Sequence, residues 1–381
     1  MTASVPPPAW GVVVIGAGPA GLGVSACLRQ RGIVHQVLER ESNIAPAWRR
    51  HYDRLHLHTT KGYSGLPLSP WPAEAPRYPS REQVVEYLQR YARDHAITPR
   101  FGVEVRRIRR QDEGLSVETS DGPVNARFVV VASGYNGVAT RPAFKGLDDF
   151  AGSVVHAGEY RNPAPYAGKR TLVVGCGNSG AEIALDLAEQ NIDVAMVVRG
   201  PVHVVPRDLL GQPTQQTAVL LSRLPVRVRD AIVTPVLNLA VGDLSRFGIV
   251  RPAMGPNRMI DELGRVPMLD VGTIGMIKAG RIRVLPAVQE VLPDRVRFAD
   301  GATHPFDAIV LATGYTPGLD RLVDGFDTIA DARGRPDRFG TESAMAGLFF
   351  VGYKNPPTGA LRELAIEAER AADAIAAQIG G

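Results

Sequence analysis

The stretch VVVIGAGPAG, residues 12–21, places four apolar residues directly before a GxGxxG loop. A helical pattern follows over residues 20–31, and a second apolar run follows over residues 33–38. Glycines at this spacing permit a tight turn and let the backbone approach a pyrophosphate, whose charge lies at the helix N-terminus. The stretch therefore predicts the β–α–β unit of a dinucleotide-binding domain.

The same pattern occurs a second time at residues 172–180, LVVGCGNSG. A helix is expected over residues 179–190 and a strand over residues 193–198. The repeat continues further along the chain. Residues 103–122 resemble residues 282–301, and each segment is followed by a similar tail, VASGY at residues 131–135 and LATGY at residues 311–315. Two copies in a strand–loop–helix context make a chance match improbable.

We therefore predict an α/β fold with two Rossmann-like dinucleotide-binding domains, the second inserted in the first. The first domain is expected over residues 1–162 and 313–381, and the inserted domain over residues 163–312. Residues 282–312 could belong to either domain. The apolar stretch 215–247 is interpreted as core helices of the inserted domain, in preference to a substrate access path.

The residue after the second strand distinguishes the two loops. Glu39 follows Gly16 by 23 positions, where a carboxylate accepts hydrogen bonds from a ribose with a free 2′-hydroxyl, as in FAD or NAD. The same offset in the second copy reaches Val198, followed by Arg199. A guanidinium suits a 2′-phosphate, so NADPH is preferred over NADH; the alternative is a solvated surface arginine. The first domain is therefore expected to be the FAD-binding domain and the inserted domain the NADPH-binding domain, and this pairing implies hydride transfer.

Composition limits the class of protein. The 381 residues are 45% hydrophobic and 22% charged with a net charge of +4, which excludes a disordered chain, and the scattered basic residues argue against nucleic acid as a partner. Cys27 and Cys176 form no CxxC pair, so neither a disulfide framework nor a metal site is expected. The first residues do not resemble a signal peptide, and no run of about 18 apolar residues occurs. We therefore predict a cytoplasmic protein with no stable membrane insertion.

Residues 150–160, FAGSVVHAGEY, read FxGxxxHxxxY. This segment resembles the fingerprint of the flavin-containing monooxygenases, the class B flavoprotein monooxygenases. Further segments narrow the resemblance to the YUCCA-like indole-3-pyruvate monooxygenases, and it covers nearly the whole chain. These segments are DRLHLH (53–58), GCGNSGAE (175–182), VHVVPR (202–207), PMLDVG (267–272) and IVLATGY (309–315). The sequence KNPP at 354–357 departs from the family pattern.

The resemblance implies an NADPH- and O₂-dependent monooxygenase acting through a C4a-(hydro)peroxyflavin. Its small-molecule substrate would be a 2-oxo acid such as indole-3-pyruvate, or a related aromatic or apolar compound, and the reaction an oxidative decarboxylation. Alternatives are an N- or S-oxygenating or Baeyer–Villiger monooxygenase, and an NADPH-oxidising flavoprotein sensor without oxygenation. A disulfide reductase is rejected because it needs a cysteine pair near the flavin. A homodimer is left open.

The resemblance also suggests site residues. His58 stands where animal members carry an asparagine, Lys61 would position groups near the flavin, and Asn136 would contact the nicotinamide; each could instead be structural. His156 is assigned to domain coupling and not to acid–base chemistry. The expected cofactor-binding residues are Gly16, Gly18, Pro19, Ala20, Gly21, Glu39, Arg40, Trp48, Gly175, Gly177, Asn178, Ser179, Gly180, Arg199, Thr313, Gly314 and Tyr315.

Overall fold

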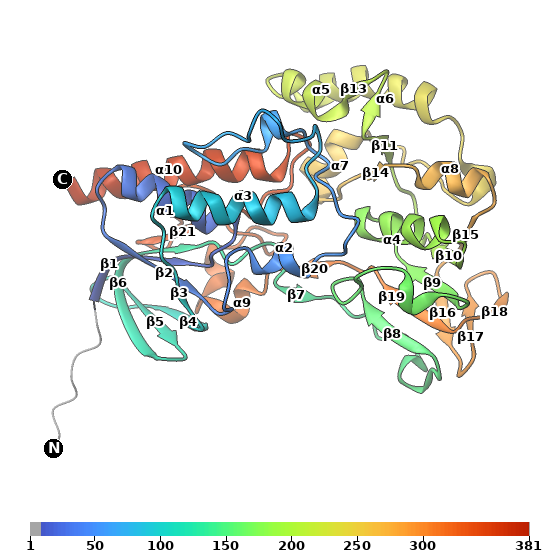
Figure 1. The fold of residues 1–381 in the computed structure, drawn as a ribbon, viewed down its shortest axis with the longest axis horizontal. Coiled ribbons are helices and arrows are strands. Elements are labelled where there is room, and N and C mark those ends of the chain that lie inside the picture. The colour runs from blue at the N-terminus through green and yellow to red at the C-terminus, as the bar shows by residue number, and fades with distance from the viewer. Residues whose placement is uncertain (1–8, 381) are drawn as a thin grey trace.

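The computed structural model describes residues 9–380 and contains two large β-sheets that lie side by side (Figure 1). In the first sheet the strand order is β3-β2-β1-β6-β5-β4, and β21 also pairs with β6. Its strands are β1 (Ala9–Ile15), β2 (His35–Glu39), β3 (Arg100–Phe101), β4 (Val105–Arg110), β5 (Leu115–Thr119), β6 (Gly122–Val131) and β21 (Leu348–Phe350). Strands β3, β2, β1, β6 and β21 are parallel, whereas β4 and β5 run antiparallel to their neighbours.

Three long helices cover one face of this sheet, namely α1 (Pro19–Gln30), α3 (Arg81–Asp94) and α10 (Ala360–Gly380). Pro19 opens α1 at a position where its missing N–H is not needed. Ser80 and Gln83 form a capping box at the start of α3. Helices α1 and α10 pack closely because small residues face each other: a Cβ on Gly23 would lie 3.4 Å from the Cβ of Ala368.

The second sheet is entirely parallel, with the order β15-β10-β9-β19-β8. Its strands are β8 (Ser153–His156), β9 (Arg170–Val174), β10 (Asp193–Val197), β15 (Ile282–Leu285) and β19 (Ala308–Leu311). One core cluster joins the sheet to α4 (Asn178–Glu189) and α8 (Thr273–Lys278). Another joins it to a small sheet of β16 (Val288–Val291), β17 (Arg295–Phe298) and β18 (Thr303–Pro305). The predicted fold of two Rossmann-like sheets is confirmed; we call the parts built on the two sheets the first and the second domain.

The chain crosses between the domains twice, and the two crossing segments pair with each other. They form an antiparallel ribbon of β7 (Val138–Ala139) and β20 (Tyr315–Thr316). Strand β8 lies before residue 163, in the range assigned to the first domain, yet it pairs with β19 at the edge of the second sheet. The expected boundary at residue 163 is therefore corrected to a point before β8. Strands β15 and β19 place residues 282–311 in the second domain.

A helical cover extends from the second domain. It comprises α5 (Thr214–Leu221) and α6 (Val226–Val241), and α7 (Pro256–Leu263) packs beside α6. The expectation of core helices is wrong here, because Leu220 is 79% exposed and Leu239 is 89% exposed. We call α5 and α6 the α5–α6 cover; hydrophobicity alone did not reveal that these helices lie outside the core.

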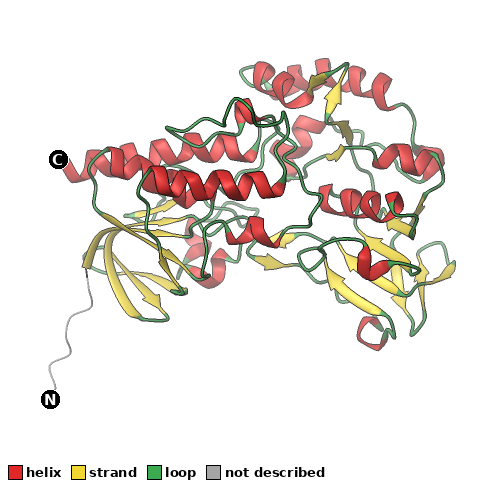
Figure 2. Ribbon diagram, viewed as in Figure 1, coloured by secondary structure: helices red, strands yellow, loops and turns green. Residues whose placement is uncertain are grey.

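The remaining elements are short. They are α2 (Pro46–Arg50), α9 (Leu319–Leu322), β11 (Val204–Pro206), β12 (Asp208–Leu209), β13 (Gln212–Pro213), β14 (Met268–Asp270) and the 3₁₀ turns Lys61–Tyr63, Leu147–Asp149, Ala164–Tyr166, Ser245–Phe247 and Phe326–Ile329. Figure 2 shows the strands of both sheets along one side of the molecule and the long helices along the other. Within residues 9–380, every helix is too short or too polar to span a bilayer.

Candidate cofactor and active site

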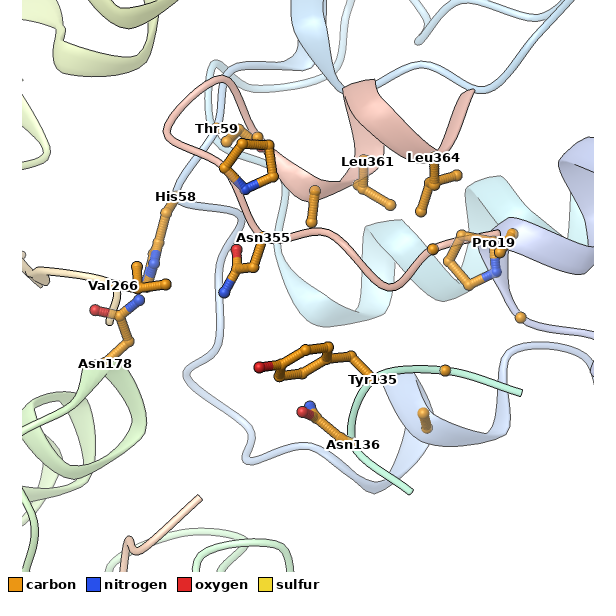
Figure 3. Close-up of a pocket in the computed structure, with 18 of the residues that line it drawn as sticks. Pro19, His58, Thr59, Tyr135, Asn136, Asn178, Val266, Asn355, Leu361 and Leu364 are labelled. Carbon is orange, nitrogen blue, oxygen red and sulfur yellow. The ribbon is translucent and has the colours of Figure 1, made fainter. Parts of the chain in front are cut away.

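A cavity of about 900 Å³ lies between the two domains. The first domain contributes its glycine loop, the end of β2 and the N-terminus of α10, whereas the second contributes the start of α4 and the inner side of the α5–α6 cover. Figure 3 shows His58, Tyr135, Asn136, Asn178 and Asn355 around this space, from segments far apart in the sequence. The cavity is therefore shared by both predicted dinucleotide-binding domains.

The three glycines of the first loop have different roles. Gly16 has a φ of +106°, and a Cβ there would lie 2.6 Å from the carbonyl oxygen of Ala132. A Cβ on Gly21 would lie 1.8 Å from the carbonyl oxygen of Gly16. Around Gly18, among the residues that the structure describes, no atom beyond the adjoining backbone lies within 4 Å of such a Cβ. Gly16 and Gly21 thus allow strand, loop and helix to pack, whereas Gly18 leaves open space for a ligand.

The second loop repeats this geometry. A Cβ on Gly175 would lie 2.4 Å from the carbonyl oxygen of Ala312, and one on Gly180 would lie 2.1 Å from that of Gly175. A Cβ on Gly177 would again have no atom of the described chain within 4 Å beyond the adjoining backbone. Ala132 and Ala312 are the second residues of the two matching tails of the sequence repeat, so each tail lies directly behind a glycine loop. Both loops therefore fit a pyrophosphate at the open middle glycine.

The end of β2 fits the ribose of an adenine dinucleotide. Glu39 is buried, and its carboxylate accepts hydrogen bonds from the backbone N–H groups of Ala17 (2.7 Å) and Glu41 (2.9 Å). These contacts hold the carboxylate beside the first glycine loop while it still lines the cavity. A carboxylate at this place suits ribose hydroxyls. The cavity is also lined by the expected residues Gly16, Gly18, Pro19, Ala20, Arg40 and Trp48.

The expected NADPH residues are only partly in the cavity. Asn178 lines it, and its Oδ1 accepts a hydrogen bond from the backbone N–H of Leu269 (2.8 Å). Arg199 is exposed just beyond β10, and no carboxylate of residues 9–380 forms an ion pair with it. Its place at the end of the second strand suits a 2′-phosphate. Among the other glycine-loop residues expected to bind a cofactor, those outside the cavity lining are Gly21 of the first loop and Gly175, Gly177, Ser179 and Gly180 of the second.

His58 links the two domains at the cavity. Its Nε2 lies 2.6 Å from Oε1 of Glu182, a buried carboxylate on α4 of the second domain. The imidazole lines the cavity as well. His58 therefore has two contacts: it lines the cavity, and it pairs with a carboxylate across the domain interface. The pair can form only when the domains lie in this relative position.

Lys61 and Asn136 differ in their surroundings. The Lys61 ammonium donates hydrogen bonds to the carbonyl oxygens of Ala73 and Ala75, both at 2.5 Å, and it does not line the cavity. These contacts anchor the loop that follows it. Asn136 is exposed and lines the cavity next to Tyr135. Of the three expected catalytic residues, the structure brings His58 and Asn136 to the cavity.

The fingerprint segment joins the domains. The Nε2 of His156 lies 3.2 Å from the carbonyl oxygen of Gly314, and its ring meets Tyr315 edge-on at 4.8 Å. Burial lowers the pKa of His156. Thr313 donates a hydrogen bond to the carbonyl oxygen of Thr140. Thr313, Gly314 and Tyr315 thus lie at the ribbon between the domains, and not at the cavity where cofactor contacts were expected.

Sequence reasoning missed several residues in the cavity wall or directly beside it. Burial lowers the pKa of His51 to about 4, so the cavity has a neutral imidazole near physiological pH. Burial together with Glu182 raises the pKa of the adjacent Tyr52. Gln215, on α5, is buried and also lines the cavity. None of these belongs to a motif with a fixed spacing, so no sequence signal pointed to them.

The two cysteines lie in different core clusters. Cys27 is buried in the first domain and Cys176 is half-buried in the second, and both are free thiols. Burial raises the pKa of Cys27 to about 11 and that of Cys176 to about 12. Both groups are therefore protonated thiols of low reactivity. Within residues 9–380, no group of three or more histidine, cysteine, aspartate or glutamate side chains could hold a metal ion.

The chain matches the pyridine nucleotide-disulphide oxidoreductase family over residues 13–208. It is 45% identical over 310 residues to the indole-3-pyruvate monooxygenase YUCCA1 of Oryza sativa subsp. japonica, covering 80% of this chain and 76% of the relative. It is 40% identical over 356 residues to YUCCA6 of Arabidopsis thaliana, covering 90% and 85%.

Solved structures agree with these relatives. A flavin-containing monooxygenase from Stenotrophomonas maltophilia superposes with a TM-score of 0.75 at 26% identity, over 98% of this chain and 99% of that chain. Cyclohexanone monooxygenase shares the fold, with a TM-score of 0.74 at 18% identity over 98% and 88%. The resemblance read from the sequence motifs is thus confirmed. Two dinucleotide loops, a shared cavity and these relatives lead to one conclusion: the chain belongs to the YUCCA-type flavin monooxygenases, enzymes that depend on FAD and NADP.

Proposed function

We propose that this enzyme uses NADPH and O₂ to convert a 2-oxo acid, with indole-3-pyruvate as the leading candidate, into the carboxylic acid with one carbon fewer. The atoms balance when one 2-oxo acid, one O₂, one NADPH and one proton yield one carboxylic acid, one CO₂, one water and NADP⁺. Bound FAD would supply the oxygen chemistry, through the C4a-(hydro)peroxyflavin that the resemblance implies. Relatives named indole-3-pyruvate monooxygenases support this substrate.

One observation carries the proposal: a single cavity contains the first glycine loop, His58 and a broad apolar wall. The wall comes from the α5–α6 cover and α7, and includes Leu221, Ile232, Val233, Val236 and Ile260. Such a wall suits an aromatic side chain of the substrate. It also lowers the local water content, which favours oxygen transfer over loss of H₂O₂.

Two arginines in the same wall suit the carboxylate of a 2-oxo acid. The guanidinium of Arg207 lies 4.2 Å from the ring centre of Tyr78, and Arg229 forms an ion pair of 3.0 Å with Asp261. Both are therefore held in place before a substrate arrives. Because guanidinium groups bind carboxylates well, they give the apolar wall a site for the charged end of the substrate.

Individual residues have proposed roles in this reaction. His58 and Asn136 would contact the flavin–nicotinamide region of the cavity, Lys61 would hold the adjacent loop, and Arg199 would bind the 2′-phosphate of NADPH. The cytoplasmic location and a homodimer are predictions that cell fractionation and light scattering would test.

The test compares coupling with different substrates. Purified enzyme with FAD and NADPH is given indole-3-pyruvate, phenylpyruvate and simpler 2-oxo acids, and CO₂ and H₂O₂ are measured per NADPH consumed. We expect nearly one CO₂ per NADPH with the aromatic acids. Coupled turnover only with amines, sulfides or ketones would favour the alternative monooxygenases. Stoichiometric H₂O₂ with every compound would favour a sensor without oxygenation.

A further inference from the structure

Helix α5 has an inverted burial pattern. Among its residues only Gln215 is buried, at 6% exposure, whereas Leu220 is 79% exposed. Amphipathic helices normally bury their apolar residues. A helix that buries an amide and exposes a leucine is therefore held at this end by hydrogen bonds and not by an apolar core.

Both ends of the Gln215 amide bind the first domain. Its Oε1 accepts a hydrogen bond from the backbone N–H of Thr60 (2.9 Å), and its Nε2 donates one to the carbonyl oxygen of Thr358 (2.7 Å). Thr60 and Thr358 are buried as well. One side chain of the second domain therefore connects two separate segments of the first domain.

The two segments both belong to the cavity. Thr60 is two residues from His58, and Thr358 directly precedes Gly359 at the N-terminus of α10, where Gly359 and Leu361 line the cavity. A Cβ on Gly359, whose φ is +106°, would lie 2.6 Å from the Nε2 of Gln215. The backbone at Gly359 is thus closely fitted around this amide.

Other contacts of the cover differ in kind. Asp230 on α6 accepts hydrogen bonds from the backbone N–H groups of Asn257 and Arg258 at the start of α7, within the same domain. Across the domain boundary, the β12–β13 hairpin meets Arg77 and Tyr78 through partly exposed hydrogen bonds. Gln215 provides the buried link between the cover and the first domain.

We propose that Gln215 is a positioning residue that holds the α5–α6 cover closed over the cavity and fixes the loops at residues 58–60 and 356–359. The amide of Gln215 accepts from Thr60 and donates to Thr358 at the same time, which neither a thioether nor an ionised carboxylate of similar length can do. A carboxylate of equal length would direct an acceptor at the Thr358 carbonyl oxygen. A closed cover keeps water from the reacting groups, and this consequence rests on the function proposed above.

The test uses the FAD-loaded enzyme with Gln215→Met, Gln215→Glu and the control Gln216→Ala, since Gln216 is the exposed neighbour on the same helix. Hydrogen–deuterium exchange is followed in the peptides that contain Thr60 and α5. We expect exchange to rise roughly tenfold or more in both Gln215 variants, with the larger effect for Gln215→Glu, and to stay at the wild-type rate in the control. A melting curve confirms that each variant is folded.

The second measurement is H₂O₂ released per NADPH in the presence of indole-3-pyruvate, which should rise severalfold in the Gln215 variants. Unchanged exchange in both variants overturns the proposed link. Faster exchange with unchanged H₂O₂ overturns its role in keeping the cavity dry. If the wild type oxygenates no 2-oxo acid, the proposed function fails, while the exchange comparison still decides whether Gln215 holds the cover.

Discussion

The substitution Gly177→Ala tests the prediction that Gly177 of the second loop faces the cofactor, whereas Gly175 and Gly180 only allow packing. Gly177 is the N-cap of α4 with φ −89° and ψ −175°, which alanine adopts without strain. Apart from the adjoining backbone, no atom of residues 9–380 lies within 4 Å of the added Cβ. The new methyl group therefore meets no part of the protein, and it occupies the space where a pyrophosphate would approach.

The two expected effects differ in size. Alanine is a poorer N-cap than glycine by about 1 kcal/mol, but it restricts the unfolded chain by about 0.4–1 kcal/mol. The net change in stability is within about 1 kcal/mol, so the Tm shifts by about 3 °C or less. Loss of one charge-assisted hydrogen bond to phosphate costs about 1.5–3 kcal/mol, which corresponds to about a 10- to 100-fold rise in the KM for NADPH.

The assay measures the KM for NADPH, the FAD content by absorbance and the Tm by calorimetry. Gly180→Ala serves as the contrasting variant, because its Cβ would lie 2.1 Å from the carbonyl oxygen of Gly175 and the backbone must move. That variant should lose about 3 kcal/mol or more of stability. An unchanged KM for NADPH in Gly177→Ala, or a loss of FAD, would refute the assignment of the two loops.

Three further predictions concern single groups. Arg199→Ala should raise the KM for NADPH about tenfold or more and leave that for NADH unchanged; equal effects on both nucleotides would remove the 2′-phosphate role. Because burial lowers the pKa of His51 from 6.5 to about 4, the unfolded chain binds a proton in this window that the folded chain does not. The free energy of unfolding should therefore fall by about 3 kcal/mol as the pH drops from 6.5 to 4, and calorimetry should find a flatter dependence in His51→Gln. Iodoacetamide near neutral pH should leave Cys27 and Cys176 unmodified by mass spectrometry, and NADPH consumption should persist; inactivation by alkylation would reopen the disulfide reductase alternative.

The structure also shows where local pattern and final position diverge. Lys61 and the segment Thr313–Tyr315 follow family motifs, yet Lys61 binds carbonyl oxygens of a loop and the segment lies at the interdomain ribbon. A family motif therefore indicates that a residue matters, but it does not say whether that residue binds a cofactor, supports a loop or joins the domains. Strand β8 lies in the range expected for the first domain but pairs with β19 of the second sheet, because local sequence does not specify which strand a short segment pairs with.

The sequence by itself determined the two glycine loops and their order, and it predicted that an acid and an arginine distinguish them. These features are local, because a tight turn, an open middle glycine and a helix N-terminus depend on residues close together in the chain. Only the tertiary structure decided that His58 meets Glu182, that Gln215 binds Thr60 and Thr358, and that α5 and α6 cover the cavity. These contacts join residues more than a hundred positions apart. The packing of the two domains decides which residues meet, and the spacing of motifs along the chain carries no information about that packing.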